Sequence, residues 1–440
     1  MNSWESTTLD DLYGEPSRNG LTRPKSVRGS GYRMINMGEI FAHERIGNIE
    51  MERVQMTEKE IASFEVKKGD LLFARQSLVL SGAGKCSLVK FIGETTTFES
   101  HLIRVRLNPK CAVPDFFFYY FISSQGKQNV QSIVMQVAAA GIRGSELAKL
   151  KVPVPPLPVQ RKIAAILSAY DDLIENNERR IRILEDMAQN LYREWFVKFR
   201  FPGHTKVKMV DSPLGKIPQG WEVIIVSELV DSCVGGGWGL ESPDGDETHP
   251  VAVIRGTDFK DLRRGEVAGV PRRFIKESAL TSRKLRHGDL VLENSVNASS
   301  RCVGTPLFIT EGLLKRIGGD VICASFCRLF RFKDVELAMF LYHHIRYLMD
   351  EGKMRFYQNV AANGIGNFQA TRFVANETVA LPATPELRRD LIDALSSFTP
   401  SHLSERIGVI RQTRDLLLPK LISGEVDVSE LDIRIPESAA

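Results

Sequence analysis

The chain has 440 residues, of which 43% are hydrophobic, and a formal net charge of +4. This length allows two or three domains with cores of their own, and the mildly basic charge permits nucleic acid as a partner without requiring it. No apolar run approaches the length of a bilayer span, and the N-terminus has no secretion-signal pattern. The six cysteines lack disulfide-framework spacing. We therefore expect reduced thiols, a cytoplasmic location and no membrane association.

Residues 1–150 are expected to form a globular head of mixed α+β structure. Short β-rich runs at residues 70–74 and 102–107 are separated by loops rich in glycine, asparagine and serine, and residues 114–123 favour a short helix. The Gly69-Asp70 pair precedes an apolar run. It indicates a turn at the start of a strand more strongly than a functional site.

Residues 151–200 are expected to form a long helix that acts as a spacer. Prolines at positions 153, 155, 156 and 158 stiffen the exit from the head. Apolar residues then recur at alternating steps of four and three, the pattern of a coiled-coil seam, with charged residues on the other faces. The seam residues are Ile163, Leu167, Tyr170, Ile174, Asn177, Ile181, Leu184, Ala188, Leu191 and Trp195. A long core helix of one large domain is the alternative interpretation.

A proline- and glycine-containing linker at residues 201–220 leads to a second α+β head at residues 221–380. A second long helix is expected at residues 381–425, followed by a C-terminal tail at residues 426–440. Pro400 interrupts this helix and Thr399 can cap a restart, so we expect a kink or short break there.

The second helix carries its own seam. Its members are Leu391, Phe398, Leu403, Ile407, Ile410, Leu417 and Leu421, with Arg414 at one further position. The polar Asn177 of the first helix is interpreted as a register or kink position that faces the break at Pro400. An antiparallel pairing of the two helices would bury both seams.

The two halves of the chain read as copies of one unit. Trp4-Glu5 recurs as Trp221-Glu222, Gly69-Asp70 recurs as Gly288-Asp289, and residues 137–142 match residues 360–365. The offset between matched positions increases slowly along the chain, as a duplication with a few small insertions would produce. The sequence therefore predicts two similar heads, each followed by a long helix, related by a pseudo-twofold axis.

Signatures of catalysis and of metal binding fail in the sequence. Residues 81–86 resemble the end of a phosphate-binding loop, but Val79 replaces the first glycine and Cys86 replaces the metal-binding hydroxyl. Cys323 and Cys327 are the only close cysteine pair, and the alternation between them favours a buried strand over a zinc site. The acidic, double-proline and aromatic motif of adenine methyltransferases is also missing. We expect a non-catalytic binding protein that holds no cofactor or metal of its own.

Basic and amide side chains in loops are the candidates for contacts with DNA. Residues 255–286 contain ten Lys or Arg against four Asp or Glu, a density suited to phosphate contacts, with a solvated basic surface as the alternative. Arginines and amides in other loops can make bidentate contacts with guanine or adenine edges. The candidate DNA-binding residues are Arg75, Gln76, Lys85, Arg143, Arg255, Arg263, Arg264, Arg272, Arg273, Lys284, Arg286, Asn294 and Arg301.

Four further segments, at residues 191–197, 199–203, 211–221 and 417–425, are similar to the conserved regions of type I restriction-modification specificity subunits. The resemblance covers the whole chain in order. It implies two target recognition domains joined by two long antiparallel coiled-coil helices, with each domain reading one half of a bipartite double-stranded DNA target. The length of the helices would then fix the gap between the halves.

The same resemblance assigns catalysis to partner proteins. Two methyltransferase subunits would use S-adenosylmethionine to methylate adenine, and two motor-nuclease subunits would use ATP and Mg. The alternatives are a modification-only complex that lacks the motor subunit and a coiled-coil scaffold that binds only proteins.

Overall fold

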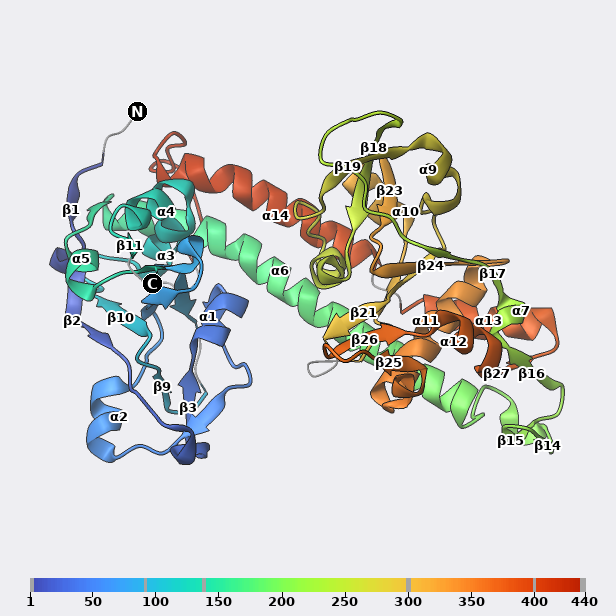
Figure 1. Cartoon of the computed structure of the whole chain (residues 1–440). Helices are drawn as coiled ribbons and strands as arrows, with labels where there is room; N and C mark the ends of the chain where they lie inside the picture. Colours follow the sequence, from blue (N-terminus) through green and yellow to red (C-terminus); the bar gives the residue numbers. More distant parts are fainter. Residues whose placement is uncertain (1–3, 91–92, 137–139, 298–301, 399–400, 436–440) are drawn as a thin grey trace. The chain divides into compact units, whose positions relative to one another are not determined.

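The computed structural model describes residues 4–90, 93–136, 140–297, 302–398 and 401–435 (Figure 1). The chain divides into two compact units. Unit 1 comprises residues 1–172 and 411–440, and unit 2 comprises residues 173–410. Each unit contains one head of mixed helix and sheet together with part of both long helices, so the predicted α+β class is confirmed. None of the helices in the described ranges has the length and apolar character needed to cross a bilayer.

The head of unit 1 is built on a five-stranded sheet of order β2-β10-β6-β8-β4, with smaller sheets β5-β3-β9, β11-β12-β7 and β1-β13. Its strands are β1 (Ser6–Thr8), β2 (Tyr13–Asn19), β3 (Arg28–Ile35), β4 (Arg45–Ile46), β5 (Glu52–Val54), β6 (Leu71–Ala74), β7 (Gln76–Ser77), β8 (Cys86–Val89), β9 (Thr96–Phe98), β10 (Leu102–Leu107), β11 (Met135–Gln136), β12 (Ala140–Gly141) and β13 (Lys151–Pro153). Its α-helices are α1 (Met37–Ala42), α2 (Glu58–Phe64), α3 (Pro114–Ile122), α4 (Ser124–Gln131) and α5 (Gly144–Ala148).

The head of unit 2 has sheets of order β17-β24-β20-β22, β19-β18-β23, β21-β26-β25 and β16-β27, and a hairpin β14-β15. Its strands are β14 (Met209–Ser212), β15 (Gly215–Pro218), β16 (Trp221–Ile225), β17 (Val230–Gly235), β18 (Glu247–Ile254), β19 (Arg272–Lys276), β20 (Leu290–Glu293), β21 (Ser295–Asn297), β22 (Pro306–Phe308), β23 (Asp320–Cys323), β24 (Cys327–Phe332), β25 (Gln358–Val360), β26 (Ile365–Phe368) and β27 (Thr378–Pro382). Its α-helices are α7 (Val226–Leu229), α8 (Phe259–Arg263), α9 (Glu277–Arg283), α10 (Glu311–Ile317), α11 (Val335–Asp350), α12 (Ala370–Asn376) and α13 (Pro385–Ser396).

Strand pairing confirms the internal repeat. The antiparallel set β10-β6-β8 recurs as β24-β20-β22, the parallel pair β3-β9 recurs as β18-β23, and β1-β13 recurs as β16-β27. The third sheet corrects one detail of the predicted alignment. Gln76 pairs with Gly141, whereas its counterpart Ser295 pairs with Asn367. Gly141 is therefore equivalent to Asn367, not to Gly364, because the loops of the two hairpins differ in length.

A buried aspartate marks the same turn in both heads. Asp70 accepts hydrogen bonds from Arg106 Nε and Nη2, both at 2.7 Å, and from the backbone N–H of its own turn at Lys67. Asp289 accepts from Arg331 Nε at 3.0 Å and Nη2 at 2.9 Å, and from the backbone N–H of Arg286. The two Gly-Asp pairs are thus structural turns, as predicted, and their carboxylates neutralise a strand arginine.

The long helices are α6 (Leu157–Tyr192), which continues into a π-helical turn at Arg193–Val197, and α14 (Ser401–Ile422). The second helix is interrupted, since α13 ends at Ser396 and α14 begins at Ser401. The predicted break is therefore confirmed, although Thr399 and Pro400 lie outside the described residues. Helical hydrogen bonding in α6 continues through the buried Asn177, so the first helix is not broken there.

At both ends, the predicted seam residues of the two helices are shared with the core of a head. Ile163, Leu167 and Leu421 belong to the core of the first head. Leu191, Trp195 and Leu391 pack in or against the core of the second head. Between these ends, one short apolar cluster is made of α6 and α14 residues without a head residue. Its members are Ile174, Ile181, Leu403 and Ile407, with Leu184 and Ile410 beside them. The ends pack into the heads because a head core offers a helix more apolar surface than a single partner helix does.

The remaining seam positions are less enclosed or differently paired. Tyr170 and Phe398 are half-buried, and Leu417 packs against the first head core. Arg414, at a seam position of α14, makes an ion pair instead of an apolar contact. Within unit 1, residues with increasing numbers along α6 contact residues with decreasing numbers along α14. The two helices therefore run antiparallel there.

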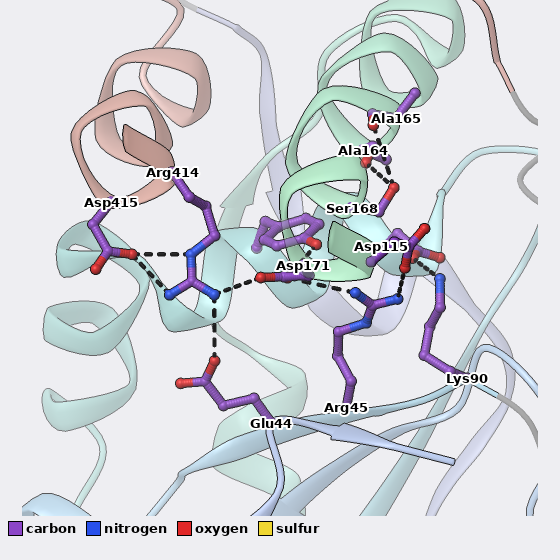
Figure 2. Close-up of polar contacts among 12 residues, drawn as sticks. Glu44, Arg45, Lys90, Asp115, Ala164, Ala165, Ser168, Asp171, Arg414 and Asp415 are labelled. Atoms are coloured by element: carbon purple, nitrogen blue, oxygen red, sulfur yellow. Dashed lines mark hydrogen bonds and ion pairs between the residues drawn. The ribbon is translucent and has the colours of Figure 1, made fainter. Parts of the chain in front are cut away.

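Asp171 of α6 is the centre of a buried polar cluster in unit 1 (Figure 2). The carboxylate is 5% exposed, its Oδ1 lies 2.5 Å from Arg414 Nη1, and its Oδ2 accepts a hydrogen bond from Tyr119 of α3 at 2.6 Å. Arg45 Nη1 lies 3.9 Å from Asp171 Oδ2. Burial lowers the pKa of Arg414, but Asp171 more than offsets this, so the guanidinium stays charged. One carboxylate therefore joins α3, α6 and α14.

His343 of α11 is a second buried ionisable group, in the head of unit 2. It is 2% exposed, and neither ring nitrogen has a hydrogen-bond partner among the described residues. Burial lowers the pKa of His343 to about 3. The imidazole is therefore neutral in the folded protein.

Replacing Asp171 with asparagine should destabilise the chain by about 3–5 kcal/mol, because the variant removes the buried counter-charge of Arg414. Asp415→Asn is the matched control, since Asp415 also bonds Arg414, at 2.8 Å, but has a side chain that is 55% exposed. The control should cost less than about 1 kcal/mol. Urea unfolding measures both, and equal midpoints would contradict the central role of Asp171.

Acidification should destabilise the second head through His343. The folded-state pKa of His343, about 3, lies below the unfolded value of 6.5. Between these values the unfolded state binds more protons, so this stability is complete above pH 6.5 and falls as the pH decreases, by up to about 1.4 kcal/mol per pH unit. His343→Gln should remove this part of the slope in unfolding measured from pH 7.5 to 5. An unchanged slope would contradict the assignment.

Candidate nucleic-acid interface

Four predicted DNA-binding residues of the first head come together at one edge. The backbone N–H of Ala74 donates to the carbonyl of Lys85 at 2.8 Å, and the N–H of Ile142 donates to the carbonyl of Arg75 at 2.9 Å. These bonds join the end of β6 to the start of β8 and to the segment after β12. Arg75, Gln76, Lys85 and Arg143 are distant in sequence but neighbours in this fold.

Three of these side chains have no polar contact with other described residues of the protein. Arg75, Gln76 and Arg143 make no side-chain hydrogen bond or ion pair within the described part of the chain, and Gln76 and Arg143 are exposed. Lys85 Nζ donates to the carbonyl of Phe41 at 2.9 Å. A guanidinium and an amide on a sheet edge that make no hydrogen bond within the described residues are suited to bidentate contacts with bases or phosphates.

The basic stretch of the second head is used differently. Arg272 donates to the carbonyls of Gly318, at 2.7 Å, and of Ile317, and so satisfies the C-terminal end of α10. Arg263 donates to the carbonyl of Pro306. These arginines stabilise loops and a helix end, a role that composition alone does not reveal.

Ion pairs occupy most of the other cations in this stretch. The pairs are Arg255 with Asp258 at 2.7 Å, Arg264 with Glu178 at 3.9 Å, Arg273 with Glu241 at 3.0 Å and Lys284 with Asp320 at 2.6 Å. Arg273 also lies over the ring of Trp238, 4.9 Å from its centroid. The charge available to a ligand is therefore smaller than the sequence count suggests. The predicted contacts of these residues with DNA stay predictions.

Asn294 takes the place in the second head that Arg75 has in the first. The N–H of Asn294 donates to the carbonyl of Phe326 at 2.8 Å, as the N–H of Arg75 donates to the carbonyl of His101 at 2.7 Å. Asn294 is followed by Ser295, whose hydroxyl donates to Asn367 Oδ1 at 2.7 Å. The repeat alignment could have identified Ser295 as the counterpart of Gln76. Asn367 was missed because the predicted alignment paired Gly141 with Gly364.

The last two predicted DNA-binding residues are Arg286 and Arg301. Arg286 is exposed, and its side chain has no hydrogen bond or ion pair within the described ranges. Arg301 lies outside the described residues. Lys127 was not predicted as a DNA-binding residue. After burial, its positive charge also lowers the pKa of Lys85, so Lys127 lies near that side chain.

The cysteine pair of the second head is divided between two strands. Cys323 ends β23 and Cys327 begins β24, so the predicted single buried strand is two strands with a turn between them. Burial raises the pKa of Cys323 to about 12. No group of three or more His, Cys, Asp or Glu able to hold a metal occurs among the residues that the structure describes.

Comparisons with known proteins agree with the duplicated architecture. Residues 1–186 match the family model of the type I restriction modification DNA specificity domain. The chain is 25% identical over 399 residues to the type I restriction enzyme MjaIX specificity subunit of Methanocaldococcus jannaschii, covering 88% of this chain and 86% of that protein. It is 28% identical over 166 residues to the EcoKI specificity subunit of Escherichia coli, covering 36% of this chain and 35% of that protein.

One solved structure shares the fold. It is the S subunit of a type I restriction-modification system from M. genitalium, with a TM-score of 0.53 and 15% identity. The match covers 95% of this chain and 96% of that one.

The structural role of Arg272 can be separated from that of Arg286 by mutation. Arg272→Ala should destabilise the chain by about 1–3 kcal/mol, because it leaves carbonyl groups at the end of α10 without a donor. Arg286→Ala should change stability by less than about 0.5 kcal/mol, since its exposed side chain makes no such contact. Thermal and urea unfolding provide the measurement. The structural assignment is wrong if both variants unfold like the wild type.

Proposed function

We propose that the chain, which is similar to type I restriction-modification specificity subunits, reads a bipartite double-stranded DNA target, one half with each head. The duplication of the polar edge carries the proposal. Arg75-Gln76 and Asn294-Ser295 occupy equivalent positions after β6 and β20. The different side chains at these positions would give each head its own half-site.

The chemistry of each edge suggests how bases and phosphates are divided. Arg75 suits the O6 and N7 acceptors of guanine, and Gln76 and Asn294 suit adenine. Arg143, Lys85 and Lys127 suit phosphate oxygens, which position the protein without reading sequence. Base contacts would therefore be concentrated at the strand ends, with cations around them.

The long helices support a fixed gap between the half-sites. A helix of 36 residues, the length of α6, is about 54 Å long. Half-sites on one face of a duplex recur about every 34 Å. A helix on this scale is long enough to set such a spacing.

Catalysis in this proposal belongs to other subunits, and the chain itself is non-catalytic. Two methyltransferase subunits would use S-adenosylmethionine to methylate adenine, and two motor-nuclease subunits would use ATP and Mg. The complex would act on DNA in the cytoplasm. Exposed apolar residues on the long helices offer docking positions for such subunits. They are Leu173, Ile183 and Met187 on α6 and Val409 on α14. A complex without the motor subunit would need the same contacts with the methyltransferase.

The proposal is tested with the chain in complex with its methyltransferase partner. The target is first found by sequencing modified bases in cells that express the complex. The cognate duplex should then compete for binding far better than a random duplex of equal length. Equal competition would contradict DNA specificity and favour a scaffold that binds only proteins.

Variants of the first edge should affect one half-site. Arg75→Ala or Gln76→Ala should weaken cognate binding by about 1–3 kcal/mol and relax discrimination in the half read by the first head only. Asn294→Ala should do so in the other half. Arg143→Ala should weaken binding to all sequences and reduce the salt slope by about 1. Loss of discrimination in both halves from one edge variant would contradict the division between heads.

A further inference from the structure

Three successive apolar side chains are exposed beside the edge of the first head. Leu78 is 99% exposed, Val79 is 60% exposed and Leu80 is 49% exposed, in the loop between β7 and β8. An exposed run of this kind has no benefit for folding, since burial of these side chains would be favourable. Such runs on a folded domain generally indicate a surface for a partner.

The loop presents these side chains on a closed, hydrogen-bonded turn. The N–H of Val79 donates to Ser77 Oγ at 3.2 Å, and the N–H of Gly82 donates back to the carbonyl of Val79 at 3.0 Å. The N–H of Gly84 donates to the carbonyl of Ala74 at 2.7 Å. Gly84 has a φ of +78°, and a Cβ there would lie 2.2 Å from a methyl carbon of Val130, so the base of the loop is closely packed.

The surroundings of the loop favour a polyanion as the partner. Arg75 and Gln76 directly precede it, Lys85 follows it, and Arg143 comes after the strand that pairs with β7. Lys127 adds a further positive charge beside Lys85, with Glu44 as the opposing acidic group. An apolar tip beside several cations matches DNA, whose phosphates attract the cations while its stacked bases accept an apolar side chain.

The equivalent edge of the second head also exposes an apolar group. Phe326, whose carbonyl accepts from Asn294, is 68% exposed. The counterparts of Leu78 to Leu80 fall partly within residues 298–301, outside the described ranges. Each head therefore has an exposed apolar side chain near its polar edge residues, although Phe326 corresponds in position to His101 and not to Leu78.

We propose that Leu78 enters the DNA at a base step of the half-site read by the first head and partly unstacks it. This inference rests on the proposed DNA-binding function. It adds a contact whose strength depends on how easily a DNA base step is deformed. Unstacking one step costs a few kcal/mol, least at flexible pyrimidine–purine steps, so the wedge would favour half-sites with such a step beside the bases contacted by Arg75 and Gln76.

The test uses the chain with its methyltransferase partner and a cognate duplex. 2-Aminopurine replaces each adenine of the half-site and its flanks in turn, and permanganate reports unstacked thymines. Binding of the wild type should raise fluorescence or reactivity at one step. Leu78→Ala should abolish that signal and weaken binding by 10- to 100-fold, whereas Leu78→Met should retain it. Leu431→Ala, which removes another exposed leucine in the C-terminal tail, should behave as the wild type.

The outcomes separate this inference from the proposed function. If the wild type prefers the cognate duplex but no step gives a signal, or if Leu78→Ala retains the signal, the wedge is overturned and DNA recognition stands. If Leu78→Ala loses the methyltransferase partner in the absence of DNA, the tip is a protein contact and the wedge is again overturned. If the wild type does not distinguish cognate from random DNA, the proposed function itself fails. Thermal unfolding of Leu78→Ala shows whether the variant is folded.

Discussion

The ion pair between Asp171 and Arg414 is the constraint on which the first unit depends. A carboxylate removed from water is unfavourable unless charges and hydrogen bonds compensate it, and here Arg414, Arg45 and Tyr119 do so. The contacts have directional geometry, unlike apolar packing. They therefore fix the rotation and the register of α6 against α14 as well as their proximity, and they connect both helices to α3 of the head. In the proposed function a helix that carries a DNA-reading head must not slide, and a buried ion pair fixes helix register better than leucine contacts do.

The duplicated unit keeps its framework and varies its edge. Both heads preserve the Gly-Asp turn, the arginine that neutralises it and the same strand pairing. At the equivalent edge, one head has Arg75 and Gln76 and the other has Asn294 and Ser295, and the adjoining hairpins differ in loop length. This division between a constant framework and a variable edge is what reading two different half-sites with one fold requires.

The fold was largely predictable from the sequence, whereas the site was predictable only in part. The hydrophobic periodicity, the internal repeat and the turn residues identified the two heads, both helices and the break before Ser401. These features can be recognised in the sequence without knowledge of tertiary contacts. The seam pattern does not reveal that Leu191 and Trp195 pack against a head core, because an apolar helix position does not specify whether a head or a helix covers it. For a similar reason, the composition of the basic stretch does not reveal which of its arginines are used within the fold. Arg272 and Arg286 are alike in sequence, but only the fold places carbonyl groups of α10 beside Arg272.

We propose that the paired helices set the distance between two half-sites. The most direct measurement duplicates one heptad in each helix, residues 175–181 of α6 and 404–410 of α14, which repeats the contacts around Ile181 and Ile407. Modified-base sequencing then reads the target in cells with the methyltransferase partner. Seven helical residues add about 10 Å, or about three base pairs. If the helices set the spacing, both half-sites should be kept with a longer gap between them. Methylation of the original spacing alone would contradict this proposal.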